Sequence, residues 1–142
     1  MLDIALAYLH HLAVFGLVGL LCAELVLVRP GLDAAQARRV AVLDGAYGGL
    51  AGLVIVAGLL RVFFGDKGWG FYAGSHVFWT KMALFLALGL MSIIPTMTFL
   101  KWRRAGEAVP DGEVRRARRF IHVELLIVAL IPLAAAGMAR GY

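Results

Sequence analysis

The sequence is poor in cysteine and in charge, and each shortage excludes a class of protein. Its one cysteine, Cys22, lies inside an apolar run, so the chain offers neither a disulfide framework nor a thiolate cage for a metal. Charged residues make up 16% of the chain and cluster between apolar runs, which excludes a soluble amphipathic bundle. No basic residue precedes the first apolar run, so we expect a permanent helix there and not a cleaved signal peptide.

The chain is rich in long apolar runs. Hydrophobic residues make up 62% of the 142 residues, and the mean hydropathy is +0.86. Ordinary soluble domains are only about half apolar. Four apolar runs, at about residues 4–28, 40–64, 77–100 and 118–138, are each long enough to cross a hydrocarbon core of about 30 Å. The sequence therefore predicts an all-α integral membrane protein with a single transmembrane domain, a four-helix bundle.

Basic residues are divided unequally between the two ends of this predicted bundle. Ten of the fourteen Lys and Arg residues fall around the connections that follow the first and third runs. Because Lys and Arg are enriched on the cytoplasmic side, we expect both termini on the non-cytoplasmic side of a bacterial inner membrane, which the chain crosses several times. The net charge of +5 then lies next to lipid headgroups, so we predict the lipid bilayer as a partner and no nucleic acid.

Glycines in the second run have a spacing that is typical of helix contacts. Gly45 and Gly49 stand four residues apart, and so do Gly48 and Gly52. Each pair leaves a shallow face on which another helix can approach closely. We predict that these faces pack within the bundle or between copies in a homo-oligomer.

Ionisable residues inside the runs form two layers, and each residue costs about 2.5–3.5 kcal/mol unless it is paired, hydrated or bound. The layer nearer the termini consists of His10, His11, Arg61, His76 and Lys81. A membrane b-type haem needs an imidazole for its iron and cations for its two propionates. In the alternative reading, the histidines bond between helices while Arg61 and Lys81 extend to the headgroups.

The other layer lies toward the basic connections. It consists of Glu24, Asp44, Tyr47, His122 and Glu124. These oxygen and nitrogen donors are suited to a divalent metal or to proton relay. His122 and Glu124 point about 160° apart on a helix, so they do not ligate one ion together. We expect instead a structural network in which Glu24 or Asp44 pairs with Arg118 or Arg119.

Helical phase places some of these residues on common faces. His10, Leu17, Leu21 and Glu24 share one face of the first run, which we expect to point into the bundle. A second stripe runs along the second helix through Tyr47, Ala51, Val54, Gly58 and Arg61. Its small residues leave space beside a bulky flat ligand.

Short segments along the whole chain carry a family resemblance. They are Ala7-Tyr8-Leu9-His10, Ala23-Glu24-Leu25, the run from Gly58 to Gly65, Phe78-Trp79-Thr80-Lys81-Met82 and Met138-Ala139-Arg140-Gly141. Through them the chain resembles the bacterial membrane proteins known as domain of unknown function 2214. More remotely, a His early in the first helix and a Lys early in the third are similar to those of HemJ-type protoporphyrinogen oxidases and CopD-like copper proteins. The HemJ likeness implies a b-type haem, with His10 as axial ligand and a haem-site or catalytic role for Lys81.

Residues and resemblance together predict a haem-b-binding membrane redox protein that passes electrons to quinone, oxygen or a porphyrin. Lys81 is the candidate catalytic residue if the protein is an oxidoreductase. The second axial ligand stays open among His11, His76, Lys81 and Met138. The alternatives are a transporter that handles copper, another cation or protons, and a structural membrane subunit without a cofactor.

Overall fold

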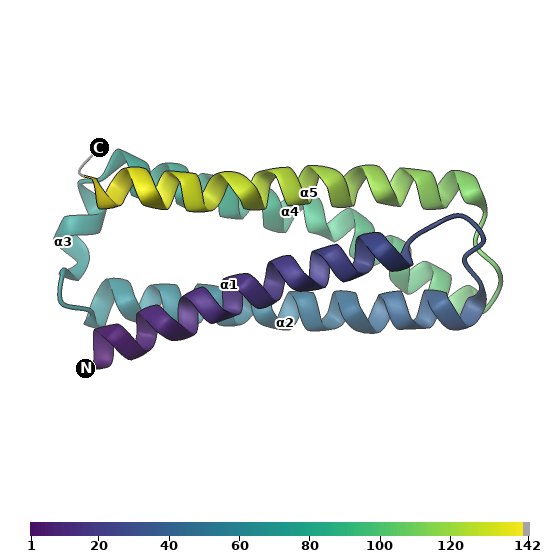
Figure 1. The fold of residues 1–142 in the computed structure, drawn as a ribbon, viewed down its shortest axis with the longest axis horizontal. Helices are drawn as coiled ribbons and strands as arrows, with labels where there is room; N and C mark the ends of the chain where they lie inside the picture. The colour runs from purple at the N-terminus through teal and green to yellow at the C-terminus, as the bar shows by residue number, and fades with distance from the viewer. Residues whose placement is uncertain (141–142) are drawn as a thin grey trace.

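The fold consists of four long helices and one short one (Figure 1). The structure is a computed structural model that describes residues 1–140, apart from the side chains of residues 138 and 139. Its helices are α1 (Leu2–Leu27), α2 (Ala34–Phe64), α3 (Gly68–Ala73), α4 (His76–Ala105) and α5 (Asp111–Ala139). The first and last helices begin and end beside α3, so we call this the α3 end of the bundle. We call the opposite end, with connections 28–33 and 106–110, the basic end.

All four long helices contain a window that is apolar enough to cross a membrane, with hydropathies between 1.9 and 2.1. The predicted four-helix transmembrane bundle is therefore confirmed. At the basic end, α2, α4 and α5 extend further than the corresponding apolar runs do. The reason at α2 is a capping box, in which the Asp33 carboxylate accepts from the Gln36 backbone N–H at 2.8 Å and the Gln36 side chain accepts from the Asp33 backbone N–H at 3.0 Å.

The long helices form a ring in which each packs against two neighbours. α1 packs against α2 and α5, and α4 packs against the same two helices, so α1 and α4 lie diagonally across the bundle. The α1–α2 pair and the α4–α5 pair are closer together at the basic end than at the α3 end (Figure 1). α3 bridges the two pairs where they are apart.

Buried side chains are concentrated toward the basic end. The main core there includes fully buried Leu21, Phe99 and Ile121. A separate small cluster of Val62, Tyr72 and Phe78 joins α2, α3 and α4 at the α3 end. The interior near the α3 end is thus packed by fewer buried side chains.

Outward-facing positions of the long helices carry large apolar residues such as Phe15, Leu86 and Leu133, each more than 60% exposed. This surface suits a lipid environment. The four predicted packing glycines also lie on it, because a methyl group added at Gly45, Gly48, Gly49 or Gly52 would meet nothing within 4 Å. The prediction that they pack within the bundle is wrong.

Close approach between α1 and α2 occurs at two other glycines. A Cβ at Gly16 would lie 2.9 Å from a methyl group of Leu50, and a Cβ at Gly58 would lie 3.3 Å from the His10 ring. The sequence spacing indicated glycine pairs that lie on the outward face of α2. A spacing of four residues places two side chains on one face of a helix but does not say whether that face is packed or exposed.

Candidate functional site

His10 lies in the interface between α1 and α2 and is partly buried. Its Nδ1 lies 3.2 Å from the carbonyl oxygen of Val54, and its ring packs against the bare backbone of Gly58. A carbonyl oxygen only accepts, so Nδ1 carries the hydrogen in this bond. The neutral ring then keeps a lone pair on Nε2, which is the atom available to a ligand.

Two cationic side chains lie near this imidazole. Arg61 from the end of α2 and Lys81 from the first turns of α4 are both partly buried, and both are close enough to act electrostatically on His10. α1 and α4 lie diagonally across the bundle, and the Nζ of Lys81 lies 5.8 Å from the centre of the buried Phe78 ring. We call His10, Arg61 and Lys81 the imidazole–cation site.

The two cations differ in their partners. Nε of Arg61 forms an ion pair with Oδ1 of Asp3 at 3.4 Å. Lys81 has no ion pair among residues 1–140, and its Nζ lies 5.8 Å from the centre of the Phe78 ring. Asp3 was missed in the sequence analysis, although the antiparallel pairing of the first two helices brings the start of one beside the end of the other.

The remaining predicted ligands do not join this site. His11 is exposed, and its Nδ1 bonds the carbonyl of Ala7 on its own helix at 2.6 Å. His76 is exposed at the first position of α4. The side chain of Met138 lies outside the described residues. Of the predicted histidine ligands His10, His11 and His76, His10 is the one that is partly buried and under the electrostatic influence of the two cations.

The second predicted layer is brought together almost completely. Glu24 of α1, Asp44 of α2 and Glu124 of α5 are 0%, 6% and 1% exposed, and Tyr47 of α2 lies near all three. Thr96 of α4, which the sequence analysis missed, lies beside Asp44. All four long helices thus contribute to one polar centre, and we call its Glu24, Asp44 and Glu124 the carboxyl cluster.

His122 is the predicted member that stays apart. It lies on the exposed side of α5, with Nδ1 bonded to the Arg118 carbonyl at 2.7 Å. This placement agrees with the expectation that His122 and Glu124 point in different directions. Within the described part of the chain, no group of three or more His, Cys, Asp or Glu side chains has an arrangement that could hold a metal ion.

The expected pairing of these carboxyls with arginines is wrong. Nη1 of Arg118 donates to the backbone carbonyls of Leu25 at 2.7 Å and Val28 at 2.5 Å, and Arg119 is exposed. Because the carbonyls at the end of α1 have no N–H partner within the helix, they accept hydrogen bonds from the Arg118 guanidinium. Both side-chain oxygens of Glu24 and Oε1 of Glu124 are left without a hydrogen-bond partner.

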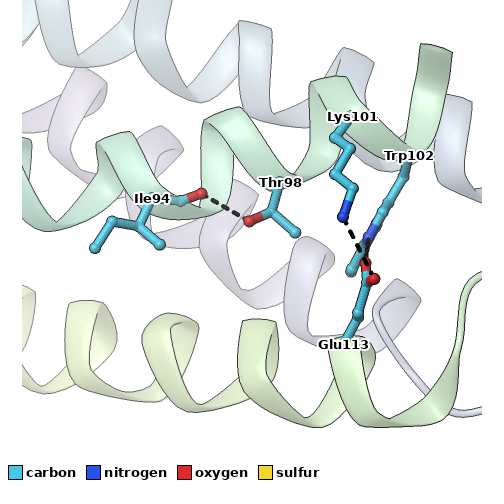
Figure 2. Close-up of polar contacts among 5 residues, drawn as sticks. All are labelled: Ile94, Thr98, Lys101, Trp102 and Glu113. Atoms are coloured by element: carbon cyan, nitrogen blue, oxygen red, sulfur yellow. Dashed lines mark hydrogen bonds and ion pairs between the residues drawn. The ribbon is translucent and has the colours of Figure 1, made fainter. Parts of the chain in front are cut away.

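A third polar group lies between α4 and α5 at the basic end (Figure 2). Glu113 accepts from Nε1 of Trp102 at 2.7 Å and pairs with Nζ of Lys101 at 3.5 Å. A hollow of about 130 Å³ lies beside these residues and extends between the helices to Pro95. Nothing in the sequence analysis singled out Trp102 and Glu113, because each looks like an ordinary helix-end residue on its own.

Comparison with known proteins identifies the family and leaves the activity open. No curated protein and no solved structure matches the chain significantly, so the remote likeness to HemJ-type and CopD-like proteins stays a prediction. The profile of one family, described as a predicted membrane protein, matches residues 2–142. Matched over nearly its whole length, the chain belongs to the DUF2214 family of membrane proteins.

Proposed function

We propose that this membrane protein binds a b-type haem through the imidazole–cation site and acts in electron transfer. The observation that carries the proposal is the state of His10. Its Nδ1 is fixed by the Val54 carbonyl while Nε2 remains free, at a partly buried position with two cations close by. Metal-binding histidines commonly have their second nitrogen held by such a carbonyl, which fixes the tautomer and orients the ring.

The charge of the surrounding residues favours an anionic group on the guest. Lys81 is a partly buried ammonium without an anionic partner among the described residues, and such a group is costly within a membrane. A propionate would supply that partner through a charge-assisted bond. Arg61 already shares its charge with Asp3, so Lys81 is the principal propionate or substrate ligand in this proposal.

Each residue of the site has a separate task. His10 would bind the haem iron through its free nitrogen, Gly58 seats the imidazole ring, and Lys81 would hold an anionic group of the guest or of a substrate. A bound haem would contribute one-electron chemistry, for which quinone, oxygen or a porphyrin is the partner we propose. We propose the bacterial inner membrane as the location and a homo-oligomer as the working unit. The concentration of arginines at the basic end supports a cytoplasmic position of that end.

The test is the absorption spectrum of the full chain, purified after expression with added haem precursor. We expect a Soret band and split reduced bands in the wild type, and loss of both in His10→Ala. His11→Ala is the matched control, because His11 is the adjacent imidazole but is exposed and bonded to its own helix. A colourless wild-type protein, or equal loss of colour in the two variants, contradicts the proposal.

Gly58→Ala separates ring positioning from ligation. The added methyl group would lie 3.3 Å from Cε1 of His10, so the ring has to move by a few tenths of an ångström. We expect this variant to keep the pigment and to shift its reduced bands or its midpoint potential. Gly49→Ala, on the exposed face of the same helix, should leave both unchanged.

A further inference from the structure

The carboxyl cluster lies at a different depth from the imidazole–cation site and has no role in the proposed haem site. Glu24 follows His10 on the same helix by about 21 Å, at about 1.5 Å per residue. Both oxygens of Glu24 and Oε1 of Glu124 are buried without a hydrogen-bond partner. Native proteins rarely leave buried polar atoms unsatisfied, and each such atom needs an explanation.

The groups that face the cluster supply no positive charge. α2 contributes Asp44 and the Tyr47 hydroxyl, and α4 contributes the Thr96 hydroxyl. Of the two arginines nearest in the sequence to Glu124, Arg119 is exposed, and Arg118 directs its Nη1 to the backbone at the end of α1. No ion pair in residues 1–140 includes a member of the cluster.

Three unpaired carboxylates in this setting would be very unfavourable. Burying a single ion without a partner costs several kcal/mol even after the protein relaxes, and like charges that share a site add repulsion. Something positive must therefore accompany the carboxyls. The candidates are protons and a bound cation.

The geometry favours protons. The described residues include no trio of ligands arranged for a metal ion. A protonated carboxyl gains an O–H donor that a neighbouring carboxyl oxygen can accept, which would give the orphaned oxygens of Glu24 and Glu124 the partner they lack. We infer that Glu24, Asp44 and Glu124 form a shared proton-binding site that holds exchangeable protons at neutral pH.

A hollow at the basic end gives solvent access toward the helix that carries Thr96. The hollow beside Glu113 extends between α4 and α5 to Pro95, and the next residue, Thr96, lies beside Asp44. Its volume of about 130 Å³ is enough for several water molecules, each of which takes about 30 Å³. Water in this hollow would bring solvent protons as far as Pro95, which precedes Thr96 on α4.

The experiment uses the purified full-length protein in detergent at neutral pH. A hydrophobic carbodiimide reacts with protonated carboxyls, and peptide mass spectrometry locates the adduct. We expect adducts at Glu24 or Glu124 and none at Glu113, the matched carboxyl that lies outside the cluster and is paired with Lys101. Infrared spectra should show a protonated-carboxyl band that shifts in D₂O and is lost in the double variant Glu24→Gln, Glu124→Gln.

Each outcome bears on the inference, and the wild-type measurements do not depend on whether a variant folds. Absence of both the adduct and the band at neutral pH overturns it. Stoichiometric sodium or a divalent metal in the purified protein, with protection of Glu24 against the carbodiimide by that cation, also overturns it and assigns a cation site instead. Retention of the band in a folded double variant assigns it to other groups and contradicts the inference.

Discussion

Replacement of Arg118 by leucine should destabilise the bundle, because it removes both hydrogen bonds and a favourable charge from the end of α1. The Arg118 guanidinium donates through Nη1 to the carbonyls of Leu25 and Val28, at 2.7 and 2.5 Å. These carbonyls lie at the C-terminal end of α1, where the helix has no further N–H groups to offer and its dipole is negative. Arg118 thus fastens α5 to the end of α1.

The size of the loss follows from these contacts. Hydrogen bonds to a charged group contribute about 1.5–3 kcal/mol each, and a cation at a helix C-terminus adds about 0.3–1 kcal/mol. Ordering an arginine side chain offsets about 2 kcal/mol of this. We expect the free energy of unfolding to fall by about 1–5 kcal/mol, which at about 1.4 kcal/mol per factor of ten raises the unfolded fraction by roughly tenfold to several thousandfold.

The measurement is unfolding in mixed micelles with increasing SDS, followed by far-ultraviolet circular dichroism. Arg119→Leu is the control, because it removes the same charge from the adjacent residue, which is exposed. The control should change stability by no more than about 0.5 kcal/mol. If the two variants unfold alike, the backbone contacts of Arg118 contribute nothing and the argument fails.

Three further predictions use the same titration. Trp102→Phe removes the 2.7 Å bond to Glu113 from a side chain that is 3% exposed, and it should cost about 1–3 kcal/mol. Gly65→Ala places a methyl group against a backbone carbonyl at the end of α2 and should destabilise the fold. The methyl group of Gly49→Ala meets nothing, so this variant should gain up to about 1 kcal/mol of stability. The reverse order of stabilities would refute the assigned faces. Asp33→Ala removes the α2 cap and should cost about 0.5–2 kcal/mol, and an unchanged midpoint would mean that the cap contributes nothing.

The spans could be predicted because hydropathy alone determines which segments enter a bilayer. Inward faces were also predictable from helical phase, since Leu17, Leu21 and Glu24 are all less than 3% exposed. Depth places His10 and Lys81 near the same end of the bundle, because both lie a few turns from the α3 end of their helices. These properties depend on position along a helix and on little else.

Partners could not be predicted in the same way. Arg118 was expected to pair with a carboxylate, but it donates hydrogen bonds to the backbone of α1 instead. The partners of Asp3 and Thr96 can be recognised only once the order of the helices around the ring is known. Glycine spacing failed for a related reason, because it does not say which face of α2 is turned toward a neighbour.

The long helices are longer than the hydrocarbon core of a bilayer is thick. The 31 residues of α2 span about 46 Å, whereas the hydrocarbon core is about 30 Å. The surplus turns at the basic end carry Arg38, Arg39 and, on α4, Lys101. In a bilayer that covers the apolar windows, these turns would reach the headgroup level, where basic side chains are favoured, and would oppose deeper insertion.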